Sequence, residues 1–236
     1  MPARNADLHG NVPDKSDVAI LLIDVINDLE FSTGDRLLAP AMRMASQLSR
    51  LARRARRLRI PVIYVNDNFG KWRSDFRELL THCLEDDVRG RPIAEQLKPD
   101  PADYFVLKPK NSGFYNTTLS LLLQYLGVKT VVLTGITTDN CVLFTAYDAY
   151  MRDLEVIVPR DCVASSDPAQ HRSALAQMRR VLKARTEPQA SVDLERLAVR
   201  RERTNGAGPR RARSGSRGRA PRPRGRDART SRVLRD

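Results

Sequence analysis

Three residues of this chain supply an acid, an amine and a thiol, each beside a short apolar segment. Asp24 ends AILLID, Lys108 ends DYFVLK, and Cys141 follows the polar loop GITTDN. A carboxylate can act as a general acid or base, and a thiolate is a nucleophile. An ammonium group near them favours the charged form of both. Together these groups could perform nucleophilic catalysis assisted by a general acid or base, if the fold brings them together.

Each of these residues also has a structural explanation when it is considered alone. Asp24 could cap the loop that follows its apolar segment, and Lys108 could be a surface lysine. Cys141 could be a small apolar residue packed at a helix start, because free cysteine is often buried and inert. The three together are more informative than any one of them.

The position of Cys141 favours an activated thiol. Thr138 or Asp139 can cap a helix that begins in TDNCVLF, which leaves free N–H groups near the sulfur atom. A helix N-terminus lowers a cysteine pKa. We therefore expect the pKa of Cys141 to lie below the unperturbed value of about 8.5, with Lys108 favouring the thiolate further.

The elements that must position these residues alternate between short apolar segments and longer segments of helical period. Candidate strands lie at 17–24, 60–67, 103–108, 129–135 and 154–159. Candidate helices lie at 40–59, 116–127, 139–153 and 167–184. Continuous apolar strands separated by helices indicate a parallel sheet covered on both faces. The sequence therefore predicts a three-layer, doubly wound α/β fold with a mostly parallel sheet and helices on both faces.

In such a sheet, ligands bind in the crevice at the carboxyl ends of the strands. The strand ends of this chain carry Asp24, the pair Asn66 and Asp67, Lys108, and the loop 135–141. We therefore expect these residues to meet at one edge of the sheet.

The composition divides the chain into a flexible N-terminus (1–16), one domain (17–199) and a basic tail (200–236). Residues 201–236 contain 13 Arg and three acidic residues, which gives them +10 of the net charge of +13. This tail has almost no large apolar side chain, so we predict that it is disordered. It could bind RNA, DNA or another polyanion by counterion release, or it could be a solvated extension without a selected role.

Neither a membrane span nor a disulfide framework is indicated. No stretch reaches the roughly 18 consecutive apolar residues of a span, and the first residues lack the apolar core of a signal peptide. We expect a cytoplasmic protein that does not enter the membrane. Cys83, Cys141 and Cys162 have no pairwise metal spacing, which indicates free thiols.

The order and context of these residues resemble the isochorismatase-like cysteine hydrolases, a family that includes nicotinamidases and N-carbamoylsarcosine amidases. The resemblance covers roughly residues 17–187. It depends on LLIDVINDLE around Asp24, LKPKNSGFYNTTL around Lys108 and VVLTGITTDNCVLFTAYDAY around Cys141, with VIVPRDCVASSDPAQH as a weaker fourth segment.

This resemblance implies a catalytic triad of Asp24, Lys108 and Cys141. It also implies a cis peptide bond between Ile136 and Thr137, after which the N–H groups of Thr137 and Cys141 form an oxyanion hole. The implied activity is hydrolysis of a small amide, ureide or carbamoyl C–N bond through a thioester on Cys141. Relatives are often dimers or tetramers, so a homo-oligomer is also implied.

The chain differs from some relatives at positions that limit which reaction types and which metal dependence we expect. Isochorismatases proper cleave a vinyl ether and commonly lack the cysteine, so Cys141 favours acyl transfer. Nicotinamidases carry a metal-binding Asp-x-His and a further His after the second strand. Here Asp67 matches, but Phe69 replaces the first His and no His follows until His82. We therefore expect no catalytic metal and no cofactor. Relatives often have Gln at Ile26, so contacts made there are not carried over.

For the substrate pocket we expect an aromatic wall with a few polar groups, as is typical of small-molecule sites. The candidates near the predicted strand ends are Asn27, Phe31, Trp72, Phe114 and Tyr115. Core packing is the alternative for each aromatic residue. Cys83 and Cys162 are expected to have no catalytic role, and His171 is expected to be a surface or capping residue because Asp24 already supplies the base.

Two other functions stay open. The chain could be a catalytically silent interaction scaffold with this fold. It could also be a nucleic-acid-binding protein that uses the arginine-rich tail.

Overall fold

The structure is a computed structural model that describes residues 15–68 and 75–198. The predicted basic tail and nearly all of the predicted flexible N-terminus lie outside these residues. Within the described part of the chain, no helix combines the length and the apolar character needed to cross a bilayer.

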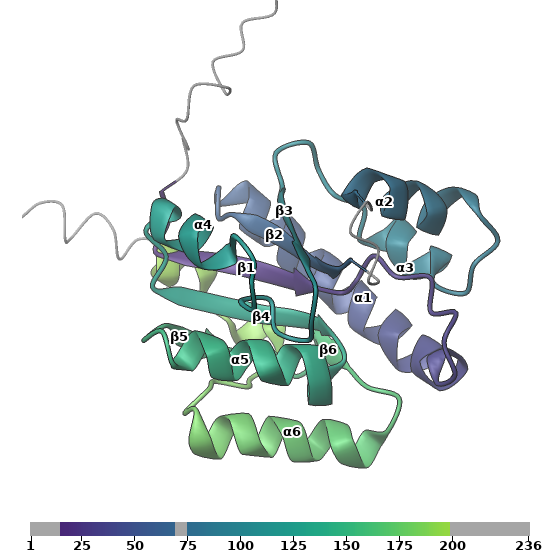
Figure 1. Ribbon diagram of the computed structural model, residues 1–236. Coiled ribbons are helices and arrows are strands. Elements are labelled where there is room, and N and C mark those ends of the chain that lie inside the picture. The colour runs from purple at the N-terminus through teal and green to yellow at the C-terminus, as the bar shows by residue number, and fades with distance from the viewer. Residues whose placement is uncertain (1–14, 69–74, 199–236) are drawn as a thin grey trace, which may run out of the picture.

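A six-stranded sheet forms the middle layer (Figure 1). The strands are β1 (Val18–Ile23), β2 (Val62–Asp67), β3 (Tyr104–Lys108), β4 (Thr130–Ile136), β5 (Glu155–Ile157) and β6 (Val163–Ala164). Their order is β3-β2-β1-β4-β5, β6 also pairs with β4, and every pairing is parallel. The predicted doubly wound α/β fold is confirmed.

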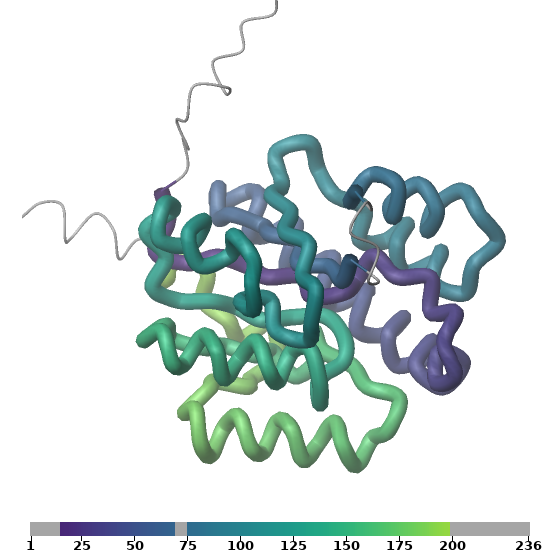
Figure 2. Tube along the Cα trace, viewed as in Figure 1, coloured from purple at the N-terminus to yellow at the C-terminus, as the bar shows by residue number. Residues whose placement is uncertain are grey.

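Helices cover both faces of this sheet. They are α1 (Gly34–Arg57), α2 (Phe76–Glu85), α3 (Arg91–Gln96), α4 (Leu119–Leu126), α5 (Leu143–Tyr150) and α6 (Pro168–Val181). A π-helical turn, η2 (Thr138–Val142), connects β4 to α5, and a 3-10 turn, η3 (Gln189–Ser191), follows α6. Figure 2 follows the chain from purple β1 in the middle of the molecule to green α6, which lies beside α5.

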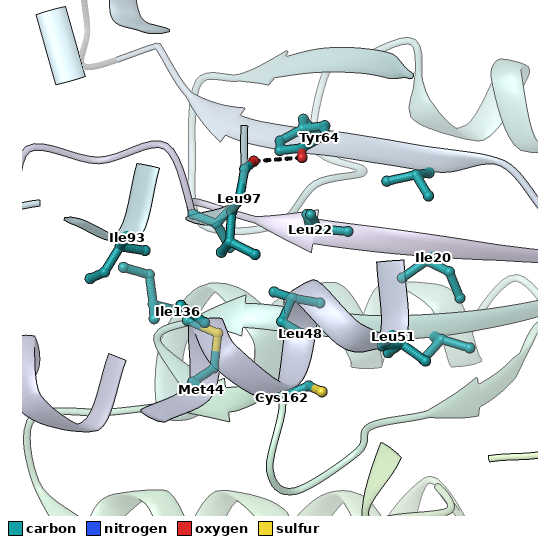
Figure 3. Packing of buried hydrophobic residues seen from close by; sticks show 14 of the residues in the cluster. Ile20, Leu22, Met44, Leu48, Leu51, Tyr64, Ile93, Leu97, Ile136 and Cys162 are labelled. Carbon is teal, nitrogen blue, oxygen red and sulfur yellow. Dashed lines mark hydrogen bonds between the residues drawn. The ribbon is translucent and has the colours of Figure 1, made fainter. Parts of the chain in front are cut away.

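The two faces of β1 explain why this strand is apolar throughout. Ile20 and Leu22 pack in one cluster with α1, α2 and α3, whereas Leu21 and Ile23 pack in a second cluster with α4, α5 and α6. Figure 3 shows the first cluster, in which the hydroxyl of Tyr64 donates a 2.7 Å hydrogen bond to the carbonyl oxygen of Leu97. A strand buried on both faces needs apolar side chains at successive positions.

The sequence misplaced or missed several elements. The helix expected at 40–59 begins at Gly34 and therefore contains Pro40, whereas proline usually marks a helix start. The two short helices α2 and α3 and the two-residue strand β6 were not predicted. They are too short for a periodic pattern, and their positions depend on packing against the sheet.

Gly135 lies where β4 passes very close to β1. Its φ is +105°, and a Cβ atom at this position would lie 2.0 Å from the carbonyl oxygen of Ile23. Gly127, at the end of α4, also has a positive φ of +78°, but a Cβ atom there would have nothing within 4 Å of it. Substitutions at the two glycines therefore distinguish the energetic cost of a positive φ from the cost of steric overlap with β1.

Gly135→Ala should destabilise the protein much more than Gly127→Ala. Both substitutions impose a left-handed backbone on alanine, which costs about 1 to 2 kcal/mol, but only Gly135→Ala adds overlap with β1. We expect losses of about 1 kcal/mol for Gly127→Ala and about 3 kcal/mol or more for Gly135→Ala. Urea unfolding measures both, and equal losses would contradict the close approach.

Candidate active site

The three predicted catalytic residues meet at the carboxyl edge of the sheet. Asp24 follows the last residue of β1, Lys108 ends β3, and Cys141 lies in η2 directly after β4. Because all strands are parallel, their carboxyl ends lie at the same edge. Residues more than a hundred positions apart in the sequence are therefore neighbours in the structure.

The side chain of Lys108 is the centre of this group. Its Nζ lies 2.9 Å from Oδ2 of Asp24, 3.4 Å from Oδ2 of Asp67 and 3.6 Å from Sγ of Cys141. The backbone N–H of Asp67 donates a 2.7 Å hydrogen bond to Oδ1 of Asp24, which fixes the other oxygen of that carboxylate. One ammonium group thus contacts two carboxylates and the thiol.

Burial makes these contacts strong. Lys108 is fully buried and Asp24 is 5% exposed. A buried ammonium is costly unless each of its N–H groups has an acceptor. Asp24, Asp67 and Cys141 supply these acceptors, so the positive charge of Lys108 is offset by its neighbours within the site.

The protonation states follow from burial and from the neighbouring charges. Burial raises the pKa of Asp24, although the Lys108 ammonium and the hydrogen bonds to this carboxylate oppose the increase. Burial lowers the pKa of Lys108, but Asp24, Cys141 and Asp67 together outweigh it, so the net pKa lies above the usual value. Lys108 therefore stays protonated while Asp24 becomes a stronger base than a solvated aspartate.

The expectation of a lowered thiol pKa is wrong for the protein without substrate. Burial raises the pKa of Cys141 to about 12, the Asp24 carboxylate contributes to the increase, and Lys108 only partly opposes it. A nearby negative charge and desolvation outweigh the effect of a helix N-terminus. Cys141 is accordingly a neutral thiol that needs a base.

The expected helix cap is also absent from the start of this turn. Neither Thr138 nor Asp139 caps η2, for which Thr137 is the N-terminal boundary residue. Instead, Oγ1 of Thr138 lies 2.9 Å from Nδ1 of His171, and Oδ1 of Asp139 accepts a 2.6 Å hydrogen bond from Ser165. Thr138 therefore connects the loop before Cys141 to α6 itself, and Asp139 connects it to the segment that precedes α6.

The predicted oxyanion residues lie in the same loop. The Ile136–Thr137 peptide bond is cis, at the position that the sequence resemblance indicated. The N–H groups of Asn140 and Val142 both donate to the carbonyl oxygen of Thr137, each at 3.1 Å. Thr137 and Cys141 both line the cavity at this edge of the sheet.

This catalytic cavity has a volume of about 460 Å³, within the usual range for small-molecule sites. Asn27 and Phe31, two of the predicted pocket residues, line it. The other lining residues are Asp24, Thr33, Asp67, Ile136, Thr137, Asp139, Asn140, Cys141 and Ser166.

The other predicted aromatic wall residues do not line this cavity. Phe114 is 4% exposed and packs in the core on the α4, α5 and α6 face, with the guanidinium carbon of Arg152 4.7 Å from its ring centroid. Tyr115, the next residue, is 53% exposed. Trp72 lies outside the described residues. The prediction was therefore wrong for Phe114 and Tyr115, because proximity in sequence to a strand end does not fix side-chain direction.

The prediction for His171 was also wrong. It is partly buried and contacts Thr138, whereas the cap of α6 is Asp167, which accepts a hydrogen bond from the N–H of Ala169. Burial lowers the pKa of His171, so its imidazole is neutral at neutral pH.

Ser166 and Thr33 are cavity residues that the sequence did not indicate, since both lie in loops without a periodic pattern.

The residues present do not fit the metal site of a nicotinamidase. Asp67 contacts Lys108 at 3.4 Å. His82 lies on α2 and pairs with Asp86 and Asp28, at 2.6 and 3.3 Å. No group of three His, Cys, Asp or Glu residues in 15–68 and 75–198 is arranged to hold a metal ion. Phe69 lies outside the described residues.

Comparisons with known proteins identify the family to which this fold belongs. A family model of the isochorismatase domain matches residues 18–189. The uncharacterized isochorismatase family protein YaaI of Bacillus subtilis (strain 168) is 40% identical over 168 residues, which cover 71% of this chain and 92% of that protein.

Two further similar proteins have names that describe amide or ureide hydrolysis. The solved structure of N-carbamoylsarcosine amidase from Thermoplasma acidophilum has a TM-score of 0.59 and 28% identity, and the match covers 75% of this chain and 99% of that one. The ureidoacrylate amidohydrolase RutB of Methylobacterium radiotolerans is 41% identical over 87 residues, which are 36% of this chain and 34% of that protein.

Alkylation of Cys141 should become faster in Asp24→Asn. This substitution removes the carboxylate that raises the thiol pKa and leaves the Lys108 ammonium in place. We expect at least about a tenfold increase in the rate with iodoacetamide at pH 8, because one pKa unit changes the thiolate fraction about tenfold. Mass spectrometry of the Cys141 peptide measures the rate, with Cys83 and Cys162 as internal controls. A slower or unchanged reaction would contradict this charge assignment.

Lys108→Met should leave Asp24 and Asp67 without their common cation. Breaking a buried ion pair typically costs about 3 to 5 kcal/mol, and we expect that loss in urea unfolding at pH 7.5. Burial holds the folded pKa of Asp24 above its unfolded value, and Lys108 opposes that increase in the natural chain. Removing Lys108 therefore raises this pKa further, so protonation at pH 5 stabilises the variant more than the natural chain and the loss shrinks. The exposed Lys110→Met is the control. A loss independent of pH would indicate that lost packing, rather than charge, is responsible.

Proposed function

The chain belongs to the isochorismatase family, and on this basis we propose that it is a cysteine hydrolase that cleaves the C–N bond of small amides, ureides or carbamoyl compounds. The observation that carries the proposal is the contact of Lys108 with both Asp24 and Cys141 at the wall of one cavity. The names of two similar proteins, N-carbamoylsarcosine amidase and ureidoacrylate amidohydrolase, support this class of bond.

The first step is attack on the substrate carbonyl. Asp24 takes the proton of the Cys141 thiol, with which it shares a hydrogen bond, and the sulfur forms a bond to the carbonyl carbon. The carbonyl π electrons move to oxygen, which becomes an oxyanion. The N–H groups of Thr137 and Cys141 stabilise this oxyanion, as preorganised donors do in acyl transfer.

The second step expels the leaving group. Protonated Asp24 gives its proton to the leaving nitrogen as the C–N bond breaks, which releases ammonia or an amine and leaves a thioester on Cys141. Asp24 is then a carboxylate again. It takes a proton from a water molecule whose oxygen attacks the thioester carbonyl. The C–S bond then breaks, and Asp24 returns this proton to the Cys141 sulfur as the acid product leaves.

The raised pKa of Asp24 suits this cycle. A base with a pKa nearer to the operating pH accepts a proton more readily than a solvated aspartate does. Lys108 stays charged throughout, so it holds the carboxylate 2.9 Å from its Nζ and keeps the site electropositive while negative charge develops. The lysine therefore positions and stabilises the reacting groups but transfers no proton.

The proposed reaction uses no metal ion. The support is the mismatch with the nicotinamidase pattern: Phe69 stands at the expected histidine position, and Asp67 contacts the Lys108 ammonium. The polarising role that a metal would play is assigned to the two backbone N–H groups. The geometry also weighs against a catalytically silent scaffold, because a fully buried ammonium is costly to retain without use.

Ammonia release from small amides should depend on Cys141 and Asp24 and persist with a chelator. We expect no activity above background in Cys141→Ala, and a decrease of about 10²- to 10⁴-fold in Asp24→Asn, the usual contribution of a general base. Cys83→Ala is the matched control, since Cys83 is a buried thiol outside the site. An enzyme-coupled ammonia assay measures these rates with and without EDTA.

Full activity in Cys141→Ala would exclude the proposed nucleophile. Loss of activity with EDTA, restored by added zinc, would exclude the metal-independent reaction.

A further inference from the structure

A second hollow lies beside the catalytic cavity and has a volume of about 680 Å³. It is enclosed by the N-terminal half of α1, the segment 160–168 and the first turn of α6. Ser166 lines both this hollow and the catalytic cavity, so the two share a wall. We call this hollow the basic pocket, and its lining residues are Arg36, Pro40, Arg43, Met44, Ser46, Gln47, Arg160, Asp161, Val163, Ala164, Ser165, Ser166, Pro168 and His171.

Positive charge dominates the rim of the basic pocket. Arg36, Arg43 and Arg160 are exposed, and among the described residues none of them has an ion-pair partner or a side-chain hydrogen bond. The only acid in the wall is Asp161, whose Oδ1 already accepts a 2.7 Å hydrogen bond from the N–H of Gln189. Three guanidinium groups are therefore available to an anion, and guanidinium binds a carboxylate in a bidentate manner.

The inner wall is apolar. Met44, Val163 and Ala164 are buried and line the basic pocket. A ligand that suits this combination has an aliphatic body and an anionic end. The two hollows together exceed the space that a one-carbon or two-carbon amide needs, because small-molecule sites of about 300 to 1,000 Å³ hold drug-sized ligands.

The basic pocket also contacts the loop that carries the nucleophile. His171 and Ser165 line the pocket, and they bind Thr138 and Asp139 at 2.9 and 2.6 Å. Those two partners precede Cys141 by three and two residues. A ligand in the basic pocket therefore touches side chains that hold the nucleophile loop in place.

We propose that the basic pocket binds the carboxylate at the far end of the substrate, while the amide carbonyl lies at Cys141. The substrate class is then the ω-amide of an aliphatic dicarboxylic acid, and hydrolysis releases ammonia and the dicarboxylate. This assignment rests on the proposed amide hydrolysis and adds the substrate class to it. Arg36, Arg43 and Arg160 bind the carboxylate, and the chain between the two ends lies over Ser166.

The first test measures binding without hydrolysis. Isothermal titration calorimetry of the full chain with adipate and suberate, two possible products, measures binding, and the arginine substitutions isolate the contribution of the basic pocket. The test variant replaces Arg36, Arg43 and Arg160 by glutamine. The control replaces Arg50, Arg53 and Arg57, which lie on α1 outside the pocket, so both variants have the same net charge.

We expect the test variant to bind the dicarboxylate at least about tenfold more weakly and the control to bind like the natural chain. An exposed ion pair changes a binding constant by up to about fivefold, and three are removed. The absence of binding to the natural chain, or equal losses in both variants, would overturn the assignment.

The second test compares two series of amides by ammonia release. One series has a terminal carboxylate and two to six methylene groups, and the other has a methyl group in place of the carboxylate. We expect kcat/KM to be at least about tenfold higher for the charged member of the best pair. The arginine substitutions should remove this preference by raising KM for the charged amide, so that kcat/KM becomes similar for the charged and the neutral member of the pair.

The two proposals fail in different ways. Hydrolysis of neutral and charged amides at equal rates would overturn the carboxylate assignment and leave amide hydrolysis standing. If the dicarboxylate binds through the three arginines but no amide is cleaved, the proposed hydrolysis fails, and the ω-amide assignment that rests on it is overturned too.

Discussion

The buried ammonium of Lys108 is the interaction on which the rest of the site depends. β3, which carries Lys108, is separated from β1 by β2 and from β4 by both, so only a long side chain can reach the ends of all three. Its contacts with Asp24, Asp67 and Cys141 join the ends of β1 and β2 to the turn after β4. The sheet supplies the parallel strand ends, and the apolar clusters on its two faces hold them in register. The main consequence of the fold for the site is that the Lys108 ammonium is buried together with the carboxylates of Asp24 and Asp67 at the carboxyl edge of the sheet.

This cluster determines the chemistry of the thiol. A lysine and the start of a helical turn both favour a cysteine thiolate, but here burial and, second, the Asp24 carboxylate raise the pKa of Cys141 and keep the proton on sulfur. In the hydrolysis that we propose, the nucleophile therefore forms only when the proton of the Cys141 thiol moves to Asp24. Coupling attack to that transfer places the same carboxylate in position to protonate the leaving nitrogen. One acid can thus serve every step, with the lysine constant in charge.

The sequence was sufficient for the five main strands and for the meeting of Asp24, Lys108 and Cys141 at one edge of the sheet, because both depend on local patterns. Apolar runs predict buried strands, and Asp24, Lys108 and Cys141 each follow such a run. It was insufficient where the outcome depends on distant segments. Phe114 and Tyr115 are neighbours, yet one packs in the core and the other faces solvent. The pKa of Cys141 depends on a carboxylate 117 positions earlier in the chain. The contacts of His171 and the basic pocket require α1 and α6 to be placed on the sheet, which no short pattern specifies.

The proposed hydrolysis requires a covalent bond between the Cys141 sulfur and the substrate carbonyl carbon. The most direct test is to mix the protein with an amide from which it releases ammonia, quench the reaction in acid within milliseconds to seconds, and measure the intact and peptide masses. We expect an adduct with the mass of the acyl group on the peptide that contains Cys141, and we expect it to appear before the acid product reaches its steady rate. No adduct in the natural chain, together with undiminished ammonia release by Cys141→Ala, would contradict it.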